Sequence, residues 1–194
     1  MLEPLGLSFT WQEYEEVFMG MDDRDAFDRA FSDAGRSLTD TERDDLIARK
    51  AAHFPKLVEE RGAKVFPGVE DLIRAVAARG PMGLSSGALR LDVEPVLHKL
   101  ELFDLFGAIV TADVVAKSKP DPESYRVCLE RLGAKDPSHW FAIEDTNAGI
   151  QSAKGAGMKV LAVTNSYPAD ALQAADRIVD SLAGVTPEVL TSWI

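Results

Sequence analysis

The feature that most limits the possible folds is an alternation of short apolar runs with helical patterns over the second two-thirds of the chain. Four runs contain no charged residue, at residues 82–85, 108–110, 140–143 and 160–163. Helical patterns follow them, near residues 89–100, 122–132, 147–156 and 169–175. Runs without polar alternation indicate strands buried on both faces, and strand–helix alternation is typical of a parallel sheet. With a short edge strand at residues 177–179, the expected fold class is α/β.

The first sixty-odd residues have a different pattern, which favours a small helical bundle. Three helices are expected, over residues 11–20, over 23–35, and from after Thr39 to before Gly62. Capping boxes predict two of the starts, since Thr10 is followed by Glu13 and Thr39 by Glu42. A further helix over residues 69–80 leads into the alternating part. We therefore expect a helical domain at residues 1–62 and an α/β domain at residues 63–194.

Composition excludes several classes of function. The chain has 194 residues, of which 46% are hydrophobic, enough to bury a core. Its net charge of −11 disfavours nucleic acid and anionic membranes as partners. No apolar stretch approaches the roughly 18 residues that span a bilayer, and no secretion leader is evident, so a cytoplasmic location is expected. The single Cys128 excludes an internal disulfide or a multi-cysteine zinc site and is expected to pack inside its helix.

Ligands of open parallel sheets bind beyond the carboxyl ends of the strands, so the residues after each run are candidate site residues. The run at 82–85 is followed by Ser86, Gly87 and a predicted helix. A hydroxyl and the amides of a helix start can together bind an anion. The alternative is that the serine only caps the helix.

Lys119 stands in a Ser-Lys-Pro-Asp-Pro motif, just before a predicted helix that starts at Pro122. Pro120 holds Lys119 in an extended conformation, and Asp121 is the expected helix cap. A lysine held rigidly there suits charge neutralisation on a phosphoryl group. The alternative is a solvated loop lysine, which is the interpretation we give to the neighbouring Lys117.

Two adjacent acids, Glu144 and Asp145, follow the run at 140–143. Mg²⁺ commonly takes one or two carboxylates and completes its shell with water and phosphate. A magnesium site at this strand end is therefore one hypothesis. The alternative is that Asp145 caps the next helix.

Taken together, these stretches resemble the haloacid dehalogenase superfamily, in the branch of the β-phosphoglucomutases and phosphoglycolate phosphatases. Three motifs carry the resemblance: Phe66-Pro-Gly-Val-Glu-Asp-Leu, Ser118-Lys-Pro-Asp-Pro and Glu144-Asp-Thr-Asn-Ala-Gly-Ile. The resemblance covers about residues 60–190. It implies a Rossmann-like parallel sheet with an α-helical cap formed by the first part of the chain.

The resemblance also implies Mg²⁺-dependent phosphoryl transfer from a small phosphorylated metabolite, by a phosphatase or a phosphomutase. Ser86 and Gly87 would then hold the phosphoryl group, and Lys119 would bind it and neutralise its charge. Asp145 would ligate Mg²⁺, with Glu144 supporting the metal site.

The chain departs from the family pattern at its start. Family members begin with a strand that ends in Asp-x-Asp, which supplies the nucleophile and the general acid/base. No Asp-x-Asp-Gly-Thr occurs in this chain, and Asp23 and Asp25 follow no apolar strand. The strands at 82–85 and 140–143 would then lack their shared central neighbour. We expect a chain that is catalytically inactive alone and that can leave Mg²⁺ unbound.

Three explanations for this departure stay open. The chain could be a truncated enzyme, a natural remnant that binds a phosphorylated ligand or a protein partner, or one half of a split enzyme. The sheet could close up, or another segment or a second copy of the chain in a swapped homodimer could fill the gap. A structural α/β module unrelated to phosphoryl transfer is the remaining alternative.

Overall fold

Side-chain caps set the starts of the helices in the first part of the chain. The structure is a computed structural model that describes residues 2–192, without the side chain of Glu15. It places α1 at Trp11–Glu13, α2 at Asp23–Asp33 and α3 at Asp40–Arg61. Both predicted capping boxes are present, at Thr10 and at Thr39. Residues 2–62 contain no strand, so the helical character of this part is confirmed.

The first predicted helix, over residues 11–20, differs from the structure. After α1 the chain continues as a π-helix over Tyr14–Phe18, closed by a bond from the Met19 amide to the Tyr14 carbonyl. Ring contacts accompany this wider turn: Phe9 meets Phe18 edge-on with centroids 4.8 Å apart, and Trp11 stacks on Tyr14. Sequence periodicity alone does not reveal such a change of helix type.

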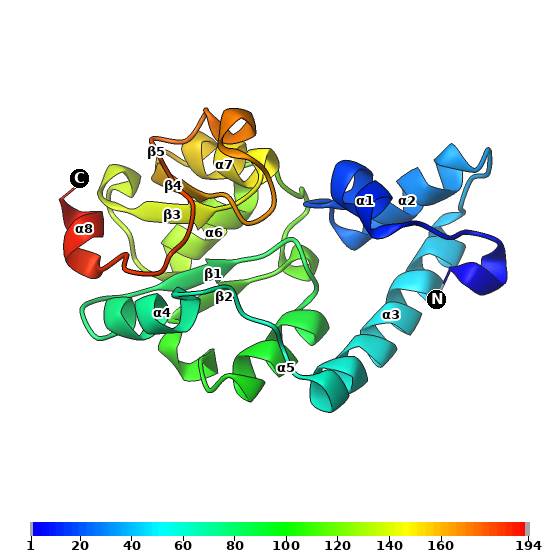
Figure 1. Ribbon diagram of the computed structural model, residues 1–194, viewed down its shortest axis with the longest axis horizontal. Helices are drawn as coiled ribbons and strands as arrows, with labels where there is room; N and C mark the ends of the chain where they lie inside the picture. The colour runs from blue at the N-terminus through cyan, green and yellow to red at the C-terminus, as the bar shows by residue number, and fades with distance from the viewer. Residues whose placement is uncertain (1, 193–194) are drawn as a thin grey trace.

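The second part of the chain alternates parallel strands with helices, which confirms the α/β class (Figure 1). The strands are β1 (Gly83–Ser85), β2 (Ala108–Val110), β3 (Phe141–Glu144), β4 (Lys159–Val163) and β5 (Arg177–Val179). The helices are α4 (Val69–Ala77), α5 (Arg90–Lys99), α6 (Glu123–Arg131), α7 (Asn147–Gly155) and α8 (Pro187–Thr191). The helix predicted at 169–175 is instead a short 3-10 helix over Ala169–Leu172.

Strand β4 shows why its sequence lacks polar alternation. Val160 and Ala162 pack with α6 and α7, whereas Leu161 and Val163 pack with α4 and α8 on the other face. All four side chains are at most 3% exposed. Within residues 2–192, no helix combines the length and the apolar character needed to cross a bilayer.

The strands form two hydrogen-bonded sheets. One has the order β1-β2 and the other the order β3-β4-β5. In the part of the chain that the structure describes, no ladder joins β1 to β3. The absence of a central strand between them stays a prediction, as does the domain boundary at residue 62.

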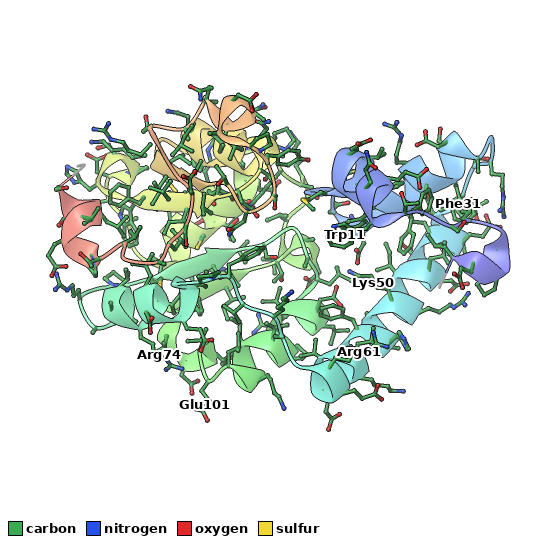
Figure 2. All side chains as sticks on the ribbon, viewed as in Figure 1. Trp11, Phe31, Lys50, Arg61, Arg74 and Glu101 are labelled. Carbon is green, nitrogen blue, oxygen red and sulfur yellow. The ribbon has the colours of Figure 1, made fainter. Side chains whose placement is uncertain are left out.

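A cluster of charged groups joins the helical part to the α/β part. The Lys50 ammonium on α3 lies 2.7 Å from Asp23 Oδ1 on α2 and 2.8 Å from Asp92 Oδ2 on α5. Figure 2 shows Lys50 on the side of α3 that faces the α/β part. Asp92 is only 4% exposed. A hydrogen bond from Ser118 to Asp22 adds a second link between the two parts.

Replacing Lys50 with methionine is expected to lower the free energy of unfolding by about 2 kcal/mol, because the buried Asp92 would lose its hydrogen-bonding partner. Burial acts to lower the pKa of Lys50, but hydrogen bonds with Asp23 and Asp92, and their charges, outweigh it and raise that pKa. The wild-type stabilisation is therefore fully present below the ordinary lysine value of 10.5 and is lost as pH rises through the raised folded pKa.

Urea unfolding at neutral and alkaline pH measures both effects of Lys50→Met. Lys154→Met is the control, because Lys154 forms a surface pair with Asp176 and is 38% exposed. It should change the free energy of unfolding by less than about 1 kcal/mol. Equal losses in the two variants would contradict the expectation.

Candidate functional site

Lys119 lies between the carboxyl ends of β1 and β3. Its Nζ donates to the carbonyl oxygen of Ser85 at 3.1 Å and to Oε1 of Glu144 at 2.5 Å. The two side chains are 13% and 8% exposed, so this ion pair is largely shielded from solvent. The interpretation of Lys119 as a solvated loop residue is wrong. It holds for Lys117, whose side chain is 72% exposed and lies 3.7 Å from Asp121.

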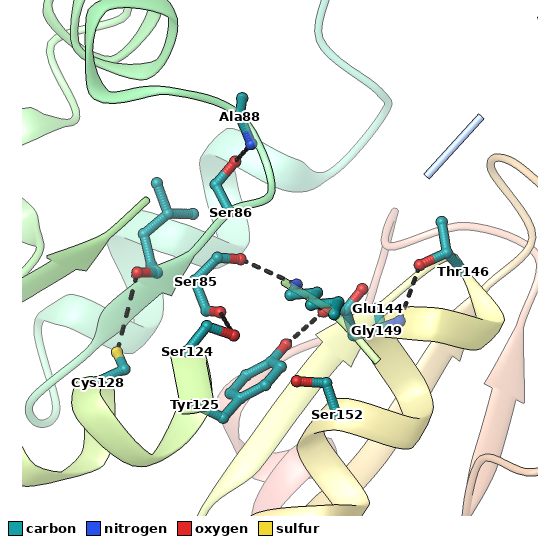
Figure 3. Close-up of polar contacts among 12 residues, drawn as sticks. Ser85, Ser86, Ala88, Ser124, Tyr125, Cys128, Glu144, Thr146, Gly149 and Ser152 are labelled. Atoms are coloured by element: carbon teal, nitrogen blue, oxygen red, sulfur yellow. Dashed lines mark hydrogen bonds and ion pairs between the residues drawn. The ribbon is translucent and has the colours of Figure 1, made fainter. Parts of the chain in front are cut away.

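The Glu144 carboxylate is enclosed by its neighbours. The Tyr125 hydroxyl donates to Glu144 Oε1 at 2.5 Å, and Figure 3 draws this contact as a dashed line. A Cβ added at Gly149 would lie well inside 3.0 Å of this carboxylate, closer than real Cβ atoms approach their neighbours. Burial, followed by the charge of Glu144, raises the pKa of Tyr125 well above its ordinary value. Tyr125 therefore stays a hydrogen-bond donor at neutral pH.

Asp145 follows β3 and does not cap the next helix. The cap of α7 is Thr146, whose hydroxyl accepts from the Gly149 amide at 3.1 Å. The capping alternative for Asp145 is therefore wrong. Its Oδ2 instead accepts a hydrogen bond from the Ser166 hydroxyl at 2.5 Å. Glu144, predicted to follow the strand, is its last residue.

Ser86 and Gly87 lie in a loop rather than at a helix start. The helix predicted near residues 89–100 is present as α5, which begins at Arg90 with Leu89 as its cap residue, so residues 87–89 separate Ser86 from the helix amides. The Ser86 hydroxyl accepts from the Ala88 amide at 3.1 Å. Ser86 therefore does not cap α5 either, and any anion cradle here would rest on the hydroxyl and loop amides.

The three candidate segments, around Ser86, Lys119 and Glu144, come together through Lys119. Its ammonium contacts the residue before Ser86 and the residue before Asp145. Helix α6, which follows Lys119, begins at Glu123, one residue later than the predicted start at Pro122. The Asp121 side chain accepts a hydrogen bond from the Glu123 amide.

Comparisons with known proteins agree with this arrangement. The family profile described as haloacid dehalogenase-like hydrolase matches residues 1–163. The chain belongs to this family. It is 33% identical over 159 residues to validoxylamine A 7'-phosphate phosphatase of Streptomyces hygroscopicus subsp. limoneus, covering 81% of this chain and 71% of that protein. It is 30% identical over 162 residues to β-phosphoglucomutase of Bacillus subtilis, covering 82% and 69%.

A solved structure supports the haloacid dehalogenase-like fold. CbbY from Rhodobacter sphaeroides, solved in complex with phosphate, superposes with a TM-score of 0.85 at 25% identity and covers 98% of this chain and 88% of that chain. The predicted superfamily and its phosphatase and phosphomutase branch are thereby confirmed, as is the fold class.

The haloacid dehalogenase-like site offers a limited set of metal ligands. Residues 2–192 hold no group of three or more His, Cys, Asp or Glu side chains that could bind a metal ion. Oε1 of Glu144 already accepts from Lys119 and Tyr125. Asp145 fits a magnesium ion held mainly by water and phosphate, which needs few carboxylates. The assignments of Asp145 and Glu144 as metal residues stay predictions.

Two residues at this haloacid dehalogenase-like site were not among the candidates from sequence. Tyr125 is only the third residue of α6, and its position shortly after the Lys119 motif is the one local signal that could have found it. Ser166 lies in the segment after β4, and nothing in the sequence places it beside Asp145. Both contacts depend on elements that are distant along the chain.

Proposed function

We propose that this chain binds the phosphoryl group of a small phosphorylated metabolite at the ends of β1 and β3, as a phosphatase or phosphomutase of its family. The observation that carries the proposal is the buried Lys119 ammonium, held between the Ser85 carbonyl and the Glu144 carboxylate. Together with a bound Mg²⁺, the Lys119 ammonium would attract a phosphoryl group despite the net charge of −11 and the neighbouring carboxylates, because charges at the site outweigh distant ones.

Each residue has a distinct role in this proposal. The Ser86 hydroxyl and the amides of its loop donate hydrogen bonds to the phosphoryl oxygens. Lys119 neutralises the charge on those oxygens, and its bonds to Ser85 and Glu144 hold it in place before a ligand arrives. Asp145 would hold Mg²⁺, supported by Glu144, and the bound ion would add further charge neutralisation.

We propose further that the chain alone binds such a ligand without turning it over. Asp23 begins α2 and is bonded to Lys50, so the Asp-x-Asp at residues 23–25 lies on a helix rather than at a strand end. The separation of the two sheets favours a second candidate, in which a copy of this chain or another chain supplies a strand beside β1 and β3. Light scattering measures whether a dimer forms.

Calorimetric titration with inorganic phosphate, with and without Mg²⁺, tests the proposed function. We expect wild-type protein to bind phosphate, and Asp145→Asn to weaken Mg²⁺-dependent binding by more than about tenfold. Asp104→Asn, at an exposed site, is the matched control and should bind as wild type does.

An assay with Mg²⁺ and an aryl phosphate should show no turnover. Lack of phosphate binding by the wild type would overturn the proposed function. Turnover that survives purification and disappears in Lys119→Ala would overturn only the proposal that the chain is inactive.

A further inference from the structure

Tyr125 contacts both charged residues at the centre of the site. Its hydroxyl donates to Glu144 Oε1 at 2.5 Å, and the same oxygen accepts from Lys119 at 2.5 Å. The Lys119 ammonium also lies 5.0 Å from the centroid of the Tyr125 ring. Tyr125 is 7% exposed, and Figure 3 shows its hydroxyl directed from α6 toward Glu144.

The Glu144 carboxylate has little room to move from this position. The absence of a side chain at Gly149 lets the carboxylate lie against α7 on one side. Tyr125 contacts it from α6 on another side. Without the phenol, Oε1 would keep only the bond from the long and flexible Lys119 side chain, which does not define an orientation by itself.

We propose that Tyr125 is a positioning residue for the phosphate-binding lysine. Its hydroxyl fixes the carboxylate of Glu144, and this carboxylate holds the Lys119 ammonium between the ends of β1 and β3. The link to phosphate rests on the proposed function, whereas the link from Tyr125 to Lys119 is independent of it.

The test compares Tyr125→Phe with wild type by two measurements. The first is the rate at which a limiting acylating reagent labels Lys119, quantified by mass spectrometry with Lys154 as internal reference. The second is the affinity for inorganic phosphate by calorimetry. We expect labelling of Lys119 to rise several-fold, labelling of Lys154 to stay unchanged, and phosphate binding to weaken about tenfold, because a hydrogen bond to a charged acceptor is lost.

Two controls separate positioning from general loosening of the fold. Ser152→Ala removes a different buried hydroxyl, which donates to the Asp121 carbonyl at 2.7 Å, and should leave Lys119 labelling unchanged. Tyr14→Phe removes an exposed phenol and should behave as wild type. Circular dichroism verifies that each variant is folded. A variant that unfolds is measured at lower temperature with trimethylamine N-oxide, which favours the folded state.

A double variant checks that Tyr125 acts through Glu144. Glu144→Gln removes the carboxylate that holds Lys119, so adding Tyr125→Phe to this variant should not raise the rate of Lys119 labelling above that of Glu144→Gln alone. Additive effects, or unchanged labelling in Tyr125→Phe alone, would overturn the proposal. If wild-type protein binds no phosphate while Tyr125→Phe still raises Lys119 labelling, the proposed function fails and the positioning role stands.

Discussion

Replacing Gly149 with alanine is expected to destabilise the protein by at least about 3 kcal/mol, because the new Cβ would collide with the Glu144 carboxylate. That carboxylate cannot move aside without breaking its buried bonds to Lys119 and Tyr125. In an open helix, the same substitution would stabilise by up to about 1 kcal/mol. The steric clash outweighs the gain in helix propensity here, so the net effect of Gly149→Ala is a loss of stability.

Thermal or urea unfolding measures this loss, which corresponds to a fall in Tm of about 6–12 °C for a chain of this size. Gly80→Ala is the matched control, because a Cβ at Gly80 meets nothing within 4 Å. It should change stability by less than about 0.5 kcal/mol. A Gly149→Ala variant as stable as wild type would show that Glu144 does not occupy the position described.

Replacing Lys119 with methionine is expected to cost about 3–5 kcal/mol of stability and to abolish phosphate binding. The stability loss follows because the carboxyl group of Glu144, 8% exposed, would stay buried without its cationic partner. Phosphate binding would fail because the site would lose its cation. Urea unfolding and calorimetric titration with inorganic phosphate measure the two effects separately.

Two comparisons sharpen this prediction for Lys119. Lys117→Met removes an ammonium whose side chain is 72% exposed, and should alter stability by less than about 0.5 kcal/mol. Adding Glu144→Gln to Lys119→Met should restore part of the stability, because it removes the unpaired charge, but should not restore phosphate binding. Recovery of binding in that double variant would rule out Lys119 as the phosphate-binding cation.

Much of the fold could be predicted from local sequence patterns, because a strand that is buried on both faces is apolar along its own length. The apolar runs match strands to within about one residue, since residues such as Val160 and Leu161 face packed helices on opposite sides of the sheet. The capping boxes at Thr10 and Thr39 are equally local, because each is complete within four residues. The prediction of a helix at residues 169–175 failed because the helical pattern there was weak, and the structure has a 3-10 helix at Ala169–Leu172.

The sequence named candidate site residues but not their contacts, and it missed Tyr125 and Ser166. The helix predicted near residues 89–100 is α5, over Arg90–Lys99, but the sequence did not show that a loop would separate Ser86 from its first turn. For Asp145 the sequence left two interpretations open, a magnesium ligand or a helix cap. The hydrogen bond from the Gly149 amide to Thr146 excludes the cap, and the magnesium site stays a prediction.

The amino-acid sequence by itself determined the α/β class, the two capping boxes and the family, because these depend on periodicity and on short motifs. Only the tertiary structure decided that Lys119 is buried and paired, and that Tyr125 belongs to the site. The physical reason is distance along the chain. Lys119 is 34 residues from Ser85 and 25 from Glu144, and folding alone brings these groups into one buried cluster.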